Sequence, residues 1–233
     1  MGKMMPHRDE NDDPAPRGVA TYSYSVGGAG LTPVRHPLTS VTEVRDIAVA
    51  LVILTFAIFF IFNLPDERGA VYYLIVSAVA VSAGFFAHEM SHKFVAKRYG
   101  CWAEFRADFR MLLLSLVVAY FIGFLYAAPG AVWISGRITR EENGKISLAG
   151  PGSNMVIALA LTPILFTGAV SQSSAVYDLA ATVFYFCSFL AAFNLIPYPP
   201  FDGLKIWSWN KGVYALALLA AGVLFVLALT SLY

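Results

Sequence analysis

Two histidines and a glutamate stand close together within an apolar stretch of the chain. His88 and His92 are four residues apart, with Glu89 between them, and the residues around them continue a helical pattern. On an α-helix a spacing of four residues is about 400° of rotation, so both imidazoles project from one face and can ligate one tetrahedral metal ion. Glu89 lies about 100° around the helix, suitably placed to hydrogen-bond a water at that metal. This division of roles is that of the H-E-x-x-H metalloprotease motif, and zinc suits these ligands best.

The alternative is a purely structural role for the same three side chains. The histidines could make hydrogen bonds between helices, and Glu89 could be neutralised by Lys93 four residues later. The metal site is favoured, because the pattern is specific and an ionisable group at membrane depth costs roughly 2.5–3.5 kcal/mol, which requires a reason.

A third metal ligand must come from elsewhere, because catalytic zinc usually takes three protein ligands and a water. Most other His, Asp and Glu candidates lie in polar stretches that look solvated: His7, His36, Glu104, Asp108, Glu141 and Glu142. Asp202 differs, because it follows an apolar run and stands after prolines that break a helix and leave a rigid extended segment. An Asp-Gly turn at a helix end is the alternative for Asp202.

Three segments carry a resemblance to a known family. HEMSH at 88–92, GPGSN at 150–154 and NLIPYPPFDG at 194–203 together resemble the site-2 protease family of intramembrane zinc metalloproteases. The likeness covers most of the chain from about Ser40 onward. Phe201 departs from the family, which more often has Leu or Met before the aspartate.

The resemblance implies a role for each matched residue. His88, His92 and Asp202 correspond to the ligands of one zinc ion per chain, and Glu89 corresponds to the general base. Asn194 corresponds to a polar residue near the scissile peptide, although its amide could equally bond a neighbouring carbonyl.

The composition excludes two classes of protein. Hydrophobic residues make up 58% of the chain and charged residues 13%, with a mean hydropathy of +0.65, which rules out a water-soluble globule. A net charge of +1 and the lack of a basic motif argue against nucleic-acid binding. Cys101 and Cys187 lack the spacing of a thiolate metal site or a disulfide framework.

Apolar runs long enough for a hydrocarbon core of about 30 Å predict an all-α polytopic membrane protein with about five to six transmembrane helices. The spans are expected near 41–64, 70–98, 151–170, 175–196 and 213–232. Ser40 and Glu43 fit a capping box at the first span, and Pro65 ends it. Residues 1–40 are polar and are expected to form a mobile tail without a signal peptide, whereas 41–233 form the membrane-embedded metalloprotease domain.

The region 107–149 is expected to contain a re-entrant segment and a small β-hairpin. If 111–128 spanned the membrane, the two histidines and Asp202 would emerge on opposite sides, whereas re-entry brings all three to one depth. Re-entry also places all but one of the 16 Lys and Arg residues on the side of the tail, as the positive-inside rule prefers. A hairpin is expected over 131–149, turning at Asn143-Gly144. The N-terminus and the zinc site should then face the cytosol.

These features predict an intramembrane zinc metalloendopeptidase that cuts a membrane-protein substrate in or near a transmembrane segment, in the manner of regulated intramembrane proteolysis. Its expected partners are a transmembrane substrate and the lipid bilayer. An extended edge at 131–138 could hold the substrate as an added strand or merely plug the protein. The alternative function is a zinc-binding transporter or sensor without protease activity, which predicts further carboxylates along a path through the membrane. Asp178 is the only other strong candidate and lies near the end of a span, which weighs against transport. A catalytically dead scaffold is disfavoured, because all four residues needed for hydrolysis are present.

Overall fold

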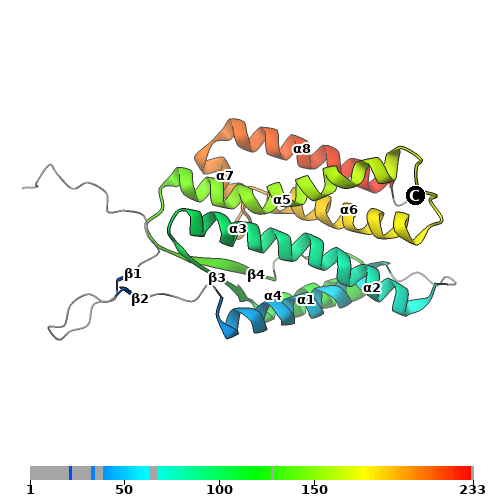
Figure 1. Ribbon diagram of the computed structural model, residues 1–233, viewed down its shortest axis with the longest axis horizontal. Helices are drawn as coiled ribbons and strands as arrows, with labels where there is room; N and C mark the ends of the chain where they lie inside the picture. Colours follow the sequence, from blue (N-terminus) through cyan, green and yellow to red (C-terminus); the bar gives the residue numbers. More distant parts are fainter. Residues whose placement is uncertain (1–20, 23–32, 35–38, 63–67, 127–128, 232–233) are drawn as a thin grey trace, which may run out of the picture.

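A computed structural model describes residues 21–22, 33–34, 39–62, 68–126 and 129–231. Its helices are α1 (Val41–Phe62), α2 (Gly69–Val81), the π-helical turn η1 (Ser82–Phe86), α3 (Ala87–Arg98), α4 (Phe109–Ile122), α5 (Arg140–Phe166), α6 (Ala175–Asn194), α7 (Gly203–Trp209) and α8 (Lys211–Thr230). Its strands are β1 (Thr21–Tyr22), β2 (Pro33–Val34), β3 (Trp102–Ala107) and β4 (Gly130–Ser135). The long helices lie roughly along the long axis of the molecule (Figure 1). Most of the predicted mobile tail lies outside the described residues, which include only 21–22, 33–34 and 39–40 of it. Residues 21–22 and 33–34 form the short β1–β2 pair. Pro65, the predicted end of the first span, also lies outside the described residues.

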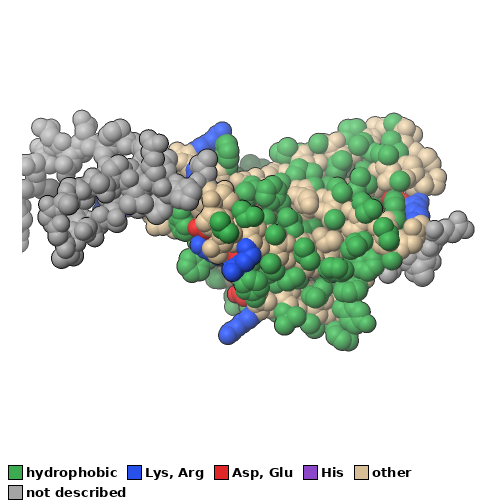
Figure 2. Space-filling model, turned by 60° about the horizontal axis from the view of Figure 1, so that its bottom comes forward, with side chains coloured by type: hydrophobic (Ala, Val, Ile, Leu, Met, Phe, Trp, Pro, Cys, Tyr) green, Lys and Arg blue, Asp and Glu red, His purple; other side chains and the backbone are tan. Residues whose placement is uncertain are grey.

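Within the described part of the chain, five helices are long and apolar enough to cross a membrane, which makes this a multi-pass membrane protein and confirms the predicted fold class. They are Val41–Phe62, Gly69–Arg98, Arg140–Phe166, Ala175–Asn194 and Lys211–Thr230. Large apolar side chains point outward from them, such as Val156 at 66% and Leu219 at 67% exposure, as expected for groups that face lipid. On the face seen in Figure 2, hydrophobic side chains cover the body, while charged side chains gather toward the ends.

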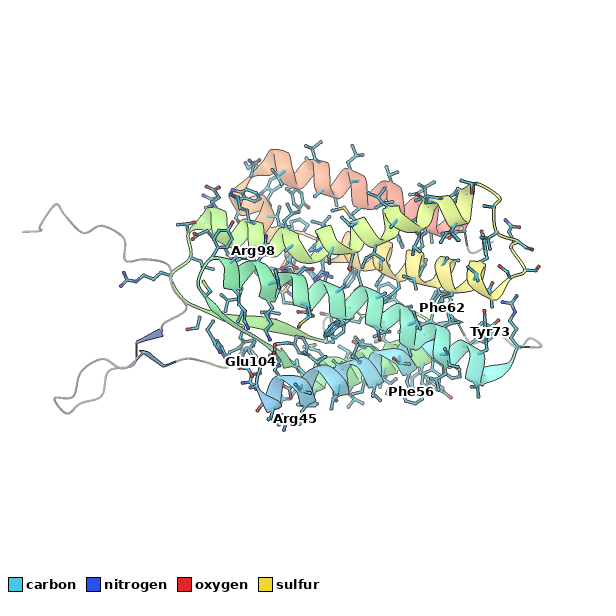
Figure 3. All side chains as sticks on the ribbon, viewed as in Figure 1. Arg45, Phe56, Phe62, Tyr73, Arg98 and Glu104 are labelled. Carbon is cyan, nitrogen blue, oxygen red and sulfur yellow. The ribbon has the colours of Figure 1, made fainter. Side chains whose placement is uncertain are left out.

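The side chains of α1 show the same division along one helix. Arg45 lies near the end that carries β3, together with Glu104, and Phe56 lies further along toward the opposite end (Figure 3). Helix α6 is the most deeply buried span, and the side chains of Phe184 and Phe186 are fully enclosed. The core therefore forms around α6, with the other spans packed outside it.

The second span is continuous from Gly69 to Arg98 but changes its winding on the way. The π-helical turn η1 stands between α2 and α3, immediately before the histidine pair. Gly84 in this turn packs against α6 so closely that a Cβ there would lie 2.5 Å from a ring carbon of Phe186. The π-turn therefore occurs at a close approach of the two helices and next to residues capable of chemistry, a frequent location for such turns.

The small sheet pairs β4 with β3. The two strands are antiparallel, with Trp102 opposite Ser135 and Ala107 opposite Gly130. The partner of β4 is thus upstream of the re-entrant segment, and the hairpin predicted over 131–149 is wrong.

Helix α5 replaces the second arm of that predicted hairpin. Asn143 and Gly144 lie inside this helix, which begins eleven residues before the predicted span at Pro151. A complete capping box starts it: Glu142 N–H donates to Thr139 Oγ1 at 3.1 Å, and Thr139 N–H donates to the Glu142 carboxylate at 2.8 Å. The two hydrogen-bonded N–H groups at the start of α5 stabilise the helix there, and this stabilisation outweighs the local preference of Asn-Gly for a turn.

The apolar segment around α4 returns to the end of the molecule from which it starts. Helix α4 has 14 residues, a length of about 21 Å, which is less than a hydrocarbon core of about 30 Å. Asp108 N–H donates to the carbonyl of Pro129 at 2.9 Å, which ties the two ends of the segment together. Ser115 Oγ also donates to the carbonyl of Tyr126 on the returning chain. This geometry agrees with the predicted re-entrant segment.

Candidate metal centre

Three buried side chains from two distant parts of the chain meet at one point. His88 and His92 come from α3, and Asp202 comes from the N-cap position of α7. The two Nε2 atoms are 3.0 Å apart, and the Asp202 Oδ2 atom lies 3.5 Å from His88 Nε2 and 3.0 Å from His92 Nε2. Ligands bound to tetrahedral zinc at about 2.0 Å are about 3.3 Å from one another, so these separations fit such an ion.

Asp202 reaches this point because the chain between α6 and α7 packs tightly. A Cβ on the following residue, Gly203, would lie 2.2 Å from the carbonyl oxygen of Leu195, so only glycine allows this approach. The Asp202 side chain makes no capping hydrogen bond to α7, so the expected alternative of a simple helix-end turn does not account for it. Lys205 Nζ donates to Oδ1 at 3.3 Å, which leaves Oδ2 directed at the histidines.

The charge state of Asp202 suits a metal ligand. Burial would raise the pKa of its carboxyl, but the positive charge of a protonated His92 and hydrogen bonds from ring N–H groups of His88 and His92 outweigh burial and hold that pKa well below its usual range. A metal ion that took the place of these ring protons would supply the positive charge instead. The carboxylate is therefore ionised at neutral pH.

The outer nitrogens of both imidazoles contact groups that orient the rings. His92 Nδ1 lies 2.7 Å from the carbonyl oxygen of Ile146 and must donate to it, which leaves Nε2 as the lone-pair donor. His88 Nδ1 lies 3.2 Å from the side-chain amide of Asn154, which is fully buried. Among the described residues the Asn154 Oδ1 atom has no hydrogen-bond partner. Exchanging the oxygen and nitrogen of this amide gives Oδ1 the His88 Nδ1–H as its donor and again leaves Nε2 for the metal.

Helix α5 approaches the same point with a glycine. A Cβ on Gly150 would lie 2.3 Å from His92 Nε2 and 2.6 Å from His88 Nε2, which is within the space that a bound ion and its ligands need. Gly150 and Asn154 therefore explain why the GPGSN segment carries a glycine at its start and an asparagine one turn later.

Glu89 and Asn194 line a cavity beside the three ligands. The cavity holds about 70 Å³, enough for several water molecules, and the strand β4 forms part of its wall. The Asn194 side chain borders this cavity, and its Nδ2 atom donates to the carbonyl of Leu190 at 3.0 Å. Glu89 is buried and borders the same space. Lys93 pairs with Glu43 rather than with Glu89, so the structural alternative considered for Glu89 lacks its counter-ion.

Two residues were misjudged from the sequence. Glu104 is buried rather than solvated, and it forms a salt bridge with Arg106 at 3.0 Å. The sequence predicts that Glu43 completes a capping box, and its backbone N–H does donate to the Ser40 hydroxyl oxygen at 3.0 Å. Its side chain instead turns inward to Lys93. The available signal was an acidic residue inside an apolar span, which normally has a partner or a function.

Comparison with known proteins gives the chain its family. It is 40% identical over 175 residues to the Methanocaldococcus jannaschii protein named "Putative zinc metalloprotease MJ0611", covering 75% of this chain and 87% of that protein. It is 29% identical over 119 residues to "Zinc metalloprotease MJ0392" of the same organism, covering 51% of this chain and 29% of that protein. No protein-family model matches the chain, and no solved structure was found to match it. The chain belongs to the zinc metalloprotease family.

Proposed function

We propose that this protein is an intramembrane zinc metalloendopeptidase of the site-2 protease type, which hydrolyses a peptide bond in or near a transmembrane segment. The observation that carries the proposal is the position of His88 and His92 inside a membrane-spanning helix. His88 lies ten residues before Arg98, the end of its 30-residue span, and is therefore about 15 Å along the helix from that end. A soluble peptide has little access to such a depth, whereas a membrane-embedded substrate lies beside it.

The chain's own residues supply the parts of a hydrolytic reaction. Zinc held by His88, His92 and Asp202 would polarise the scissile carbonyl and lower the pKa of water toward about 7. Glu89 accepts the proton of the attacking water as its oxygen bonds to the carbonyl carbon. Glu89 then gives that proton to the amine as the carbon–nitrogen bond breaks. Asn194, at the cavity wall, orients the substrate backbone.

The strand β4 is the element best suited to hold the substrate. A peptide bond within a helix is shielded and hydrogen-bonded, so a transmembrane substrate must become extended before it can be cut. Gly130, Val132 and Ile134 of β4 border the cavity that contains Glu89 and the histidines. An extended substrate can add to this edge as a further strand and gain main-chain hydrogen bonds beside the metal.

The distribution of positive charge supports an orientation with the metal site toward the cytosol. Arg68 lies at the start of α2, at the opposite end of its span from the metal centre. Fifteen of the 16 Lys and Arg residues of the sequence belong to the tail or to segments at the metal-site end. The positive-inside rule places that end in the cytosol.

A library of transmembrane peptides, incubated with the detergent-purified protein and analysed by mass spectrometry, tests the proposal. The wild-type protein should release defined products, and Glu89→Gln should keep one zinc per chain but release none. The exposed Glu141→Gln on α5 is the matched control and should cleave like wild type.

The same experiment separates the alternative of a transporter or sensor. Such a protein would bind zinc stoichiometrically in both forms and yield no product in either. Product formation by Glu89→Gln at the wild-type rate would instead remove Glu89 from the mechanism.

A further inference from the structure

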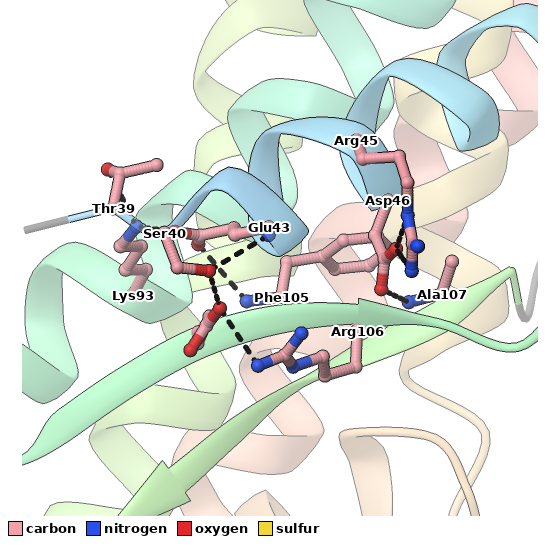
Figure 4. A network of polar contacts seen from close by, with 10 residues as sticks. Thr39, Ser40, Glu43, Arg45, Asp46, Lys93, Phe105, Arg106 and Ala107 are labelled. Carbon is pink, nitrogen blue, oxygen red and sulfur yellow. Dashed lines mark hydrogen bonds and ion pairs between the residues drawn. The ribbon is translucent and has the colours of Figure 1, made fainter.

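A second buried polar cluster, here called the α1–β3 junction, lies beside the metal centre. It consists of Glu43 and Asp46 on α1, Lys93 on α3, and the backbone N–H groups of Phe105 and Ala107 on β3. Figure 4 shows these groups between the first helix and the strand that carries Phe105 and Ala107. The mechanism proposed above uses none of them.

Glu43 links three elements with one carboxylate. Its side chain is 0% exposed. One oxygen accepts the N–H of Phe105 at 3.1 Å, and the other accepts from Lys93 Nζ at 2.5 Å. Lys93 directly follows the metal ligand His92, so Glu43 connects β3 to the turn of α3 that carries the metal ligands.

Asp46 makes an equivalent contact further along the strand. Its Oδ2 atom accepts the N–H of Ala107 at 3.3 Å, and Arg45 holds the other oxygen at 2.9 Å. Phe105 and Ala107 are two residues apart, so their N–H groups leave the same side of β3. The two carboxylates of α1 thus occupy the hydrogen-bonding edge of the sheet that faces α1.

The strand register determines which groups remain on the other edge. In an antiparallel pair, when the N–H and C=O groups of one residue point away from the partner strand, those of the residue directly opposite also point away from their partner. Phe105 lies opposite Val132, and Ala107 lies opposite Gly130. The N–H and C=O groups of Val132 and Gly130 therefore point to the other edge of β4, which pairs with no further strand among the residues that the structure describes. Both residues border the cavity that contains Glu89.

We propose that Glu43 and Asp46 are positioning residues that close one edge of the sheet and hold the other at a fixed place relative to the metal. The inference rests on the proposed function, because it assumes that an extended substrate adds to β4. With β3 anchored to α1 and through Lys93 to α3, a substrate strand has one edge available and one register. The junction therefore determines which peptide bond of the substrate reaches the metal.

The cost of burying these charges supports a role other than stability. A buried ion pair is often no more stabilising than apolar residues of similar volume, because both charges lose their hydration. An apolar pair in place of Glu43 and Lys93 could seal α1 against α3, but it could not accept the N–H of Phe105. The carboxylate oxygen provides what apolar packing lacks, a directional bond to a specific strand position.

Two double variants separate the bond to the strand from the ion pair. Both Glu43→Leu with Lys93→Met and Glu43→Gln with Lys93→Met remove the buried charges, but only the glutamine keeps an oxygen for the N–H of Phe105. Each is compared with wild type for zinc content, for amide hydrogen exchange of Phe105 and Ala107, and for cut sites in one transmembrane peptide. Glu141→Leu with Lys145→Met removes an exposed ion pair on α5 and is the matched control.

The leucine variant should bind one zinc but lose protection at Phe105 and cut at additional bonds about two residues from the main site, since a slip of two preserves the strand face. Its kcat/KM should fall by about 10-fold to 100-fold. The glutamine variant and the control should keep the wild-type cut site. A leucine variant with unchanged protection and an unchanged cut site would overturn the proposal. Wild-type protein that releases no product would refute the proposed function instead, leaving the exchange data to test the anchoring of β3.

If the leucine variant does not fold, Asp46 decides the question. Asp46→Ala removes the acceptor for Ala107, whereas Asp46→Asn retains an oxygen there. The alanine variant should broaden the cut sites, and the asparagine variant should restore the wild-type pattern. Equal cut patterns in these two variants would overturn the proposal.

Discussion

The metal centre and the α1–β3 junction are both buried and polar, yet hydrogen-bond donors and acceptors are arranged differently in the two. In the junction each donor meets an acceptor: Lys93 Nζ meets the Glu43 carboxylate at 2.5 Å, and the N–H of Phe105 meets the same carboxylate at 3.1 Å. In the metal centre three potential acceptors converge. His88 Nε2, His92 Nε2 and Asp202 Oδ2 point at one position, and the outer nitrogens of the rings are engaged elsewhere.

A structural polar cluster can therefore be distinguished from a reactive one by the way its donors and acceptors are arranged. Paired donors and acceptors satisfy each other and resist movement, so the junction holds elements in place. Converging lone pairs repel each other unless a cation or protons join them, so the metal centre is arranged for an ion. Disrupting the first should change stability and alignment, whereas disrupting the second should change metal binding.

Loss of a metal ligand should have the largest effect. His88→Ala removes one of three donors, so zinc content should fall far below one per chain and peptide cleavage should fall to background. Ser91→Ala, on the same helix, is the control and should keep both. Metal analysis of purified protein together with product detection measures the effect. Full zinc occupancy in His88→Ala would show that the three groups do not form one metal site.

The second largest effect is expected when a methyl group is added beside the ligands. Gly150→Ala places a Cβ 2.3 Å from His92 Nε2, so the ligands must separate and zinc affinity should fall sharply. Gly152→Ala is a matched control two residues along α5, where a new Cβ meets nothing within 4 Å. Equal zinc affinities of the two variants, measured by competition with a chromophoric chelator, would contradict the close approach of α5.

The junction should respond in stability rather than in zinc binding. Lys93→Met leaves the Glu43 carboxylate buried without its cation, which should lower the free energy of unfolding by about 3–5 kcal/mol. Adding Glu43→Gln removes that charge and should recover most of the loss. Denaturant titration in detergent micelles measures both. A Lys93→Met protein as stable as wild type would show that Glu43 is hydrated and not held as described.

The orientation of one imidazole should have a smaller effect on the metal. Asn154→Ala removes the contact to His88 Nδ1, and loss of such a partner typically lowers metal affinity by about 10-fold to 100-fold. Nitrogen NMR of labelled histidine should also show His88 losing its single tautomer. Ser153→Ala, at the neighbouring position on α5, should leave both the affinity and the tautomer unchanged. An unaltered tautomer in Asn154→Ala would assign the orientation of His88 to other groups.

The smallest effect is expected at the opposite end of the molecule. Arg68 and Asp178 form a salt bridge whose side chains are 32% and 26% exposed. Such pairs typically contribute no more than about 1 kcal/mol, so Arg68→Gln with Asp178→Asn should barely change unfolding and should leave zinc content intact. A loss of zinc in this variant would favour an ion path through Asp178 and hence the transporter alternative.

The membrane spans and the candidate metal ligands could be predicted from the sequence because their signals are local. Twenty apolar residues in a row report a span without any tertiary information. The four-residue spacing of His88 and His92 fixes their common face, and Asp202 was distinguished by its prolines and the apolar run before it. Gly150 stood in a recognised segment, but only the structure shows that its missing side chain leaves room beside the histidine nitrogens.

The rest depended on contacts between distant residues. Lys93 lies 50 positions from Glu43, and no periodic pattern links them. The strand partner of β4 was missed because the stretch before α4 looked like a polar connection. The predicted hairpin failed for a reason visible in the sequence: Thr139 and Glu142 have the spacing of a capping box, which should have outweighed Asn143-Gly144.

The π-helical turn η1 makes the length of the second span as important as its residues. Each residue on a helix adds about 100° of rotation. Because a π-turn accommodates one extra residue, loss of one codon between Ser82 and Phe86 would let the helix rewind regularly with His88 still on the face toward Asp202. Loss of one codon within Gly69–Val81 would instead rotate the two parts of the span against each other by about 100°, although every functional side chain would still be encoded. Mutational scans that only exchange amino acids cannot detect this dependence, whereas a series of single-codon deletions along the helix would map it directly.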